Sequence, residues 1–138
     1  MDEKLVRLQK RAARVILDCD IYTPTSIMFS DLKWMSFPER VIYMKAIQMF
    51  KTIRGGAPEY LRSSFTFASD IHARPLRSSS NFQLYTPKPR LEIYRNTFVF
   101  SDSSVWNSLP SYIHNSNSVQ DFKAQYFRWV NPSDQGHL

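Results

Sequence analysis

Hydrophobic residues recur at helical spacing near the start of the chain, over about residues 2 to 18. At about 100° per residue, the apolar side chains fall on one stripe and the arginines fall opposite. The stripe contains Leu5, Leu8, Ala12, Val15 and Ile16, and the opposite side contains Arg7, Arg11 and Arg14, with Lys10 beside them. The pattern predicts an amphipathic helix that ends near Asp18.

A second, shorter helix is predicted from about Pro24 to Lys33. Thr23 is a suitable N-cap residue. Pro24 suits the first helical position because its φ is fixed near the helical value and because the helix needs no amide hydrogen there. The buried side of this helix is expected to contain Ile27, Met28, Leu32 and Trp34.

The clearest helical pattern begins at Ser36 and ends at Gly55-Gly56. Ser36 and Glu39 have the spacing of a capping box, and the glycine pair is a helix terminator. The apolar face contains Val41, Met44, Ile47 and Phe50, broadened by Ile42, Met49 and Ile53. Because this arc is wide, we expect the helix to be central to the core, with one more turn of helix at 57–61.

The helical period is lost after Leu61. Residues 62–81 combine serine, arginine and isolated aromatics, which predicts a mobile loop. Residues 82–85 and 91–100 are rich in aromatic and β-branched side chains around a proline-containing connection, which predicts a small β-hairpin or two extended segments.

Helical spacing returns near the end of the chain. "VWNSLPSYI" predicts a turn of helix followed by a bend at Pro110. Ser118 and Asp121 then form an N-cap for a last helix, which ends near Val130 because Asn131 and Pro132 stop it. One face of that helix contains Val119, Phe122, Tyr126 and Trp129, and residues 131–138 are expected to be a disordered tail.

Together these patterns predict a mainly α fold: a small helical domain of about four helices with a short β-hairpin or extended insertion. The 138 residues fit one domain, and a hydrophobic content of 43% is too high for a wholly disordered chain. Trp34, Trp106 and Trp129 are the expected core anchors, with Met44 and Met49 filling gaps between them.

The charge balance permits a polyanionic partner. Lysine and arginine total 18 against 12 acidic residues, a formal net charge of +6. The candidate nucleic-acid contacts form two groups: Arg7, Lys10, Arg11 and Arg14 on the first helix, and Arg74, Arg77, Lys88, Arg90 and Arg95 farther on, where Tyr85 and Tyr94 could stack on unpaired bases. The competing interpretation is an ordinary charged outer face, since arginine and lysine are good helix formers.

The sequence contains no recognisable catalytic constellation. It lacks an Asp-Asp pair, and "DCD" at 18–20 is the nearest substitute, which more simply solvates a turn. His72, His114 and His137 are far apart in polar segments, so we expect exposed loop residues, and one cysteine, Cys19, gives neither a disulfide nor a zinc spacing. No cofactor or metal and no membrane partner is expected, and without a signal peptide the protein is expected to be intracellular.

Three stretches occur in an order that is informative: "LQKRAARVI", then "LKWMSFPERVIYMKAIQMFKTIRGGAPEYL", then "VWNSLPSYI" followed by Phe122-Lys123. Over about residues 5 to 130 this order resembles the C-terminal region of jockey-like, LINE-type reverse transcriptases from non-LTR retrotransposons. The resemblance implies one post-thumb module over residues 1–130 of an RNA-directed DNA polymerase, detached here from the polymerase core. It also implies no activity alone, because the family's aromatic-x-Asp-Asp motif is absent.

Such a module is expected to help bind RNA or DNA and to contact the polymerase core. Two alternatives stay open. The wide apolar arc of residues 38–54 would also suit a protein-interaction or scaffolding module that docks or self-associates. A remnant of a decayed element, without a selected role, is the other. The first helix poses the sharpest question: its apolar stripe either packs inward or meets a partner outside this chain.

Overall fold

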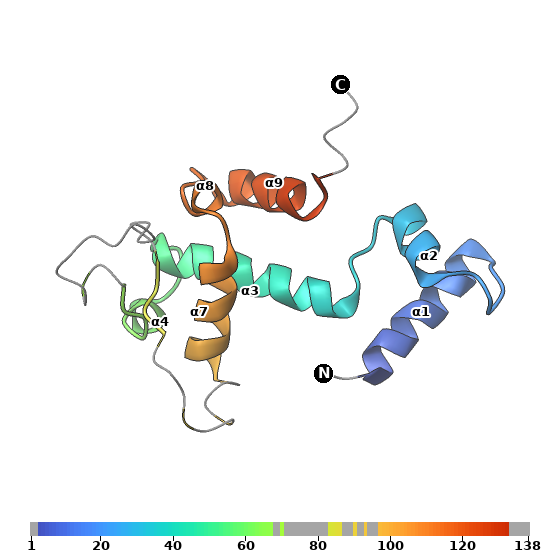
Figure 1. Ribbon diagram of the computed structural model, residues 1–138, viewed down its shortest axis with the longest axis horizontal. Helices are drawn as coiled ribbons and strands as arrows, with labels where there is room; N and C mark the ends of the chain where they lie inside the picture. The colour runs from blue at the N-terminus through green and yellow to red at the C-terminus, as the bar shows by residue number, and fades with distance from the viewer. Residues whose placement is uncertain are drawn as a thin grey trace. The chain divides into compact units, whose positions relative to one another are not determined.

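The computed structural model (Figure 1) describes residues 3–67, 70, 83–86, 90, 93 and 97–132. The chain is mainly α-helical, as predicted, with seven helices in the described residues. They are α1 (Glu3–Leu17), α2 (Thr25–Leu32), α3 (Phe37–Ile53), α4 (Glu59–Arg62), α7 (Phe98–Ser108), α8 (Ser111–His114) and α9 (Val119–Val130). The chain divides into two compact units, Met1–Met44 and Lys45–Leu138, and the division falls inside α3.

The first unit is built on the packing of α1 against α2. Ala13 and Met28 are fully buried and Phe29 nearly so, with Trp34 packed partly buried beside them. The Phe29 and Trp34 ring centroids lie 6.1 Å apart. Leu17, Cys19 and Leu32 complete this small core.

The predicted start of α2 is wrong by one residue. Pro24 is the N-cap, and its carbonyl oxygen accepts the amide hydrogens of Ile27 and Met28. The Thr23 hydroxyl instead donates to the Asp20 side chain. The prediction that Ile27 is buried is also wrong, because that side chain is 52% exposed while Phe29 takes the inner position.

α3 begins and ends as the sequence predicts. Glu39 accepts the Ser36 amide at 3.0 Å, and Ser36 Oγ accepts the Glu39 amide at 3.5 Å, which completes the capping box. At the other end Gly55 has φ +81°, a conformation that costs glycine little, and the Gly56 amide bonds to the Lys51 carbonyl at 2.7 Å.

The apolar face of α3 is buried only in its second half. Ile47, Met49, Phe50 and Ile53 are buried, as predicted. Ile42 and Met44 are 44% and 50% exposed, so the expectation that they broaden the core is wrong. Ile42 and Met44 belong to the first unit. The small core of that unit is formed by residues of α1 and α2 and does not include them.

The second unit has an aromatic core. Trp106 of α7 and Phe122 of α9 are fully buried, and the Phe122 ring stacks on Phe50 of α3 at 4.7 Å between centroids. Trp106 is therefore the core anchor that was predicted. Trp129 is not, because it lies at the edge of this stack with 38% of its surface exposed.

Two further elements of this unit differ in how well they were predicted. Residues 98–100, expected to be extended, form the first turn of α7, which runs far longer than the single turn expected. The last helix matches its prediction: the Asp121 amide donates to Ser118 Oγ at 3.1 Å, and the helix ends at Val130 with Asn131 as its C-cap.

Several predictions lie wholly or partly outside the described residues. Of the predicted loop at 62–81, only 62–67 and Asp70 are described, and of the predicted tail only Asn131 and Pro132. Where the β-hairpin was expected, the described residues contain one isolated antiparallel bridge, between Phe67 and Leu84. The single module over residues 1–130 stays a prediction, because two compact units can serve one function.

Candidate nucleic-acid interface

α1 presents three different sides. Five of its residues are basic and one, Glu3, is acidic. One side packs on the rest of the first unit through Ala13 and, partly buried, Val6 and Leu17. A second side carries exposed basic residues, and the third carries the apolar stripe. The functional question therefore becomes which residues of α1 are free to meet a partner.

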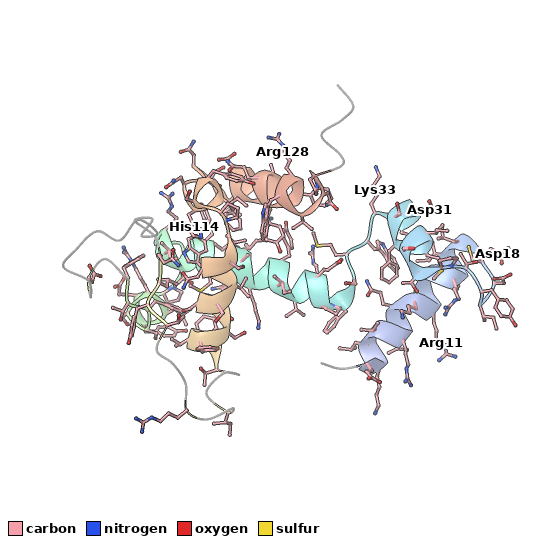
Figure 2. The ribbon with its side chains drawn as sticks, viewed as in Figure 1. Arg11, Asp18, Asp31, Lys33, His114 and Arg128 are labelled. Atoms are coloured by element: carbon pink, nitrogen blue, oxygen red, sulfur yellow. The ribbon has the colours of Figure 1, made fainter. Side chains whose placement is uncertain are left out.

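Lys4, Arg7 and Arg11 form a basic row on α1. All three are exposed and fall within about 60° of one another at the spacing of an α-helix. Figure 2 shows the Arg11 side chain extending away from the ribbon. Arg7 pairs with Glu3 at 3.5 Å, but both side chains are largely exposed, at 75% and 85%. Such a pair contributes little to stability, so Arg7 can exchange it for a phosphate.

Lys10 and Arg14 lie differently from the basic row. Both are half-buried, and the Nε of Arg14 is buried with no hydrogen-bond partner among the described residues. Their stems therefore contribute to the packed side of α1. Of the four predicted contacts on this helix, Arg7 and Arg11 have the free exposure that a phosphate contact needs.

The second predicted basic group is not assembled by the described residues. Arg90 is exposed, whereas Arg74, Arg77, Lys88 and Arg95 lie outside the described residues, as does Tyr94. Tyr85 is 43% exposed, and its amide bonds to the Thr66 carbonyl at 2.8 Å. This group stays a prediction from sequence.

The apolar stripe of α1 faces outward. Leu5 is 41% exposed, Leu8 57%, Val15 81% and Ile16 59%. Ala12 in the middle of the stripe is exposed too, while its neighbour Ala13 is fully buried. The side that packs is thus turned by about 100° from the most apolar side, since adjacent residues on a helix differ by that angle.

Gln9 has a structural role that the sequence analysis missed. Its side-chain Nε2 donates to the Met35 carbonyl at 2.7 Å, and its Oε1 accepts the Phe37 amide at 2.9 Å. One carboxamide thereby fixes the chain just before α3 to the middle of α1. The only available signal was a polar residue between the apolar stripe and the packed side.

Asn107 does the same in the second unit. Its Oδ1 accepts the Leu84 amide at 2.9 Å, and its Nδ2 donates to the Leu84 carbonyl at 2.8 Å. Leu84 is buried, so these bonds satisfy both of its backbone groups. "WNSLP" therefore places a core tryptophan (Trp106), the residue that binds the Leu84 backbone (Asn107) and a buried leucine (Leu109) within four positions at the end of α7.

His114 is buried, which corrects the expectation of an exposed loop residue. It is 2% exposed, and its ring stacks on Trp106 with centroids 4.2 Å apart (Figure 2 labels it at α8). Nε2 lies 2.7 Å from the Trp106 carbonyl oxygen, which can only accept, so Nε2 carries the hydrogen. Nδ1 is buried with no partner among the described residues. Burial lowers the pKa of His114, and the bond to the Trp106 carbonyl opposes that shift.

The remaining ionisable candidates have structural surroundings. Asp20 accepts the Tyr22 amide at 2.8 Å and so stabilises the turn after α1. Burial raises the pKa of Asp102 in α7, against the opposing charge of Lys45. The described part of the chain holds no group of three or more metal-binding side chains. None of its helices combines the length and the apolar character needed to cross a bilayer.

No family model, no curated protein and no solved structure matches this chain.

Proposed function

We propose that this chain is a non-catalytic nucleic-acid-binding module of the kind found at the C-terminus of jockey-like non-LTR reverse transcriptases. Its basic row, Lys4, Arg7 and Arg11, contacts the phosphates of RNA or DNA. The motif order along the chain supports the relationship. The single observation that supports the activity is that three cations share one exposed side of α1.

The expected chemistry is electrostatic. Each cation that neutralises a phosphate releases condensed counterion, so three contacts give a slope of log affinity against log salt of about −2 on a single strand. Contacts of this kind position the chain without reading bases. A module of this sort holds template or target while the chemistry takes place elsewhere in a polymerase.

A salt-titrated binding assay tests this proposal. The full chain is titrated with single-stranded RNA and with duplex DNA, and compared with an Arg7→Ala/Arg11→Ala variant. We expect the variant to bind roughly tenfold more weakly at low salt and to lose about 1.4 units of salt slope on single strands.

The matched control is Lys123→Ala/Arg128→Ala on α9. Both residues are exposed, and the substitution changes the net charge by the same amount. If the control weakens binding as much as the α1 variant, affinity depends on net charge alone and the assignment to α1 is wrong. If neither polymer binds, the interpretations as a protein-docking module or as a remnant of a decayed element take its place.

The protein-docking alternative now depends on a different surface from the one first expected. The second half of α3 is buried within the second unit, so only the first half of its apolar arc, with Ile42 and Met44, stays exposed. The exposed apolar stripe of α1 is longer than this remainder and is the observation that most favours a docking function.

A further inference from the structure

The apolar stripe of α1 has the spacing of a coiled-coil seam. Leu5, Leu8, Ala12 and Val15 follow one another at intervals of three, four and three residues, which are the a and d positions of two successive heptads. The seam extends over about 15 Å, from the helical rise of 1.5 Å per residue. Ile16, at the following e position, broadens the C-terminal end of this exposed apolar stripe.

The seam is exposed although the helix itself is packed. Val6, Ala13 and Leu17 occupy the b and f positions and form the packed side, where Ala13 is fully buried. α1 is therefore held helical by its own unit while the a and d positions face outward. A partner that docks on the seam does not have to order α1, which removes much of the nucleation cost that makes short coiled coils weak.

The residues beside the seam indicate the charge of the partner. The g positions are Lys4 and Arg11, both exposed, and the e positions are Gln9 and Ile16. Charges at e and g set the choice and orientation of a partner helix. Cations at both g positions favour acidic residues opposite them.

Other occupants fit the seam less well. A second copy in antiparallel orientation would bring Lys4 and Arg11 of one copy against those of the other, and in parallel orientation they would face uncharged residues. A helix that inserts into lipid usually has a broad apolar face with Trp or Phe. The residues of this stripe are all aliphatic, and neither Trp nor Phe is among them.

We infer that the exposed a/d face of α1 is a docking seam for an acidic amphipathic helix of a partner protein. The partner helix supplies aliphatic residues at its own a and d positions and Glu or Asp at the flanking positions that face Lys4 and Arg11. This inference goes beyond the nucleic-acid proposal and does not rest on it. Arg11 belongs to both surfaces, so nucleic acid and the acidic helix compete for it.

A designed peptide serves as the probe: three heptads with Leu at a and d and Glu at e and g, labelled with a fluorophore. Its anisotropy is measured with the full chain, and a second peptide with Lys at e and g is the charge control. We expect saturable binding of the Glu peptide only. A Leu8→Gln/Val15→Gln variant should bind it at least about tenfold more weakly, a change of 1.4 kcal/mol.

The matched control variant is Tyr22→Gln/Ile27→Gln. These residues are exposed and apolar and lie in the same unit, but outside the seam. The control should bind the peptide within about twofold of the parent chain, because scattered exposed apolar residues do not form a seam. Equal weakening by both double variants would overturn the inference, as would equal binding of the two peptides or no binding of the Glu peptide.

Two further measurements use the same variants. If the chain binds phosphatidylserine-containing vesicles and Leu8→Gln/Val15→Gln abolishes that binding, the face is a lipid surface and the inference is wrong. It is also wrong if light scattering shows a dimer that the same variant dissociates. Leu8→Gln/Val15→Gln keeps the charge of the chain, and Arg7 lies outside the seam at a c position. The RNA affinity of this variant should therefore stay within about twofold of that of the parent chain. Loss of peptide binding and loss of RNA binding are therefore distinguishable.

Discussion

The two compact units use their apolar side chains in opposite ways. The second unit encloses large rings, with Trp106 and Phe122 fully buried and Phe50 stacked against Phe122. The first unit encloses Ala13, Met28 and Phe29, and leaves Leu8 and Val15 on its surface. Apolar periodicity thus marks where a helix can bind, and the rest of the fold decides whether the partner lies inside the unit or outside it.

The units are alike in one device. In each, a single carboxamide side chain on a helix bonds to both a backbone N–H and a backbone C=O of a distant segment. Gln9 does this with Phe37 and Met35, and Asn107 with Leu84. In each unit, these two hydrogen bonds satisfy backbone groups that, in a β-sheet, would bond to a neighbouring strand.

The largest effect is expected at the aromatic core of the second unit. Phe122→Ala should lower the free energy of unfolding by about 3–5 kcal/mol, because it removes a fully buried ring that stacks on Phe50 and leaves a cavity. Thermal unfolding followed by near-UV circular dichroism measures the change. A decrease below about 1 kcal/mol would mean that this core does not hold the unit together.

A smaller loss is expected from the core of the first unit. Met28 is fully buried between α1 and α2, and Met28→Ala should cost about 2–3 kcal/mol. Its neighbour Ile27 is half exposed, so Ile27→Ala is the control and should cost less than about 1 kcal/mol. Hydrogen exchange of α1 amides reports the loss. Equal effects of the two substitutions would contradict the assignment of the packed side of α2.

The carboxamide clamp is expected to be worth less again. Asn107→Ala should cost about 1–3 kcal/mol, because the N–H and C=O of buried Leu84 both lose their partner. The Leu84 amide should then exchange with solvent faster. Asn107→Asp keeps the acceptor for that amide and loses only the donor, so it should retain more protection than Asn107→Ala. If the two variants exchange alike, the clamp is not what protects Leu84.

Acid should weaken the second unit through His114. Burial lowers its folded-state pKa below the ordinary 6.5, so the unfolded chain takes up a proton first as the pH falls. The contribution of neutral His114 to the free energy of unfolding is fully present above about pH 6.5 and is lost as the pH falls toward the lowered pKa. His114→Gln keeps a donor for the Trp106 carbonyl and cannot titrate, so its stability should change less between pH 7.5 and 5. Parallel pH profiles for the two proteins, measured in denaturant, would contradict this role.

Local signals in the sequence predicted three helix caps correctly, whereas the predicted Thr23 cap of α2 is wrong by one residue. The Ser36–Glu39 capping box, the Gly55-Gly56 terminator and the Ser118 cap all depend on residues a few positions apart. The inner side of a helix depends on distant residues instead. Ala13 is buried because α2 returns to that side of α1, and nothing within α1 indicates where α2 will pack.

The candidate site was likewise predicted only in part. The basic character of α1 is evident from its arginines, and two of the four predicted contacts, Arg7 and Arg11, are freely exposed. The helical spacing grouped Arg14 with them, but its aliphatic stem lies near the packed side of α1. The sequence pattern did not identify that side as packed. Gln9 and Asn107 were missed because a lone carboxamide carries no local pattern.

The smallest effect on stability is expected at the exposed apolar stripe of α1, the surface by which the first unit differs most from the second. Leu8→Gln and Val15→Gln should each change the free energy of unfolding by less than about 0.5 kcal/mol, because neither side chain is buried by its own unit. The same substitution in the second unit, Ile113→Gln, places an amide at a fully buried position and should be strongly destabilising. Parallel thermal melts of the three variants make the comparison. A large loss at Leu8 or Val15 would mean that the outward face of α1 packs within this chain, and it would remove the basis for a docking seam while leaving the basic row untouched.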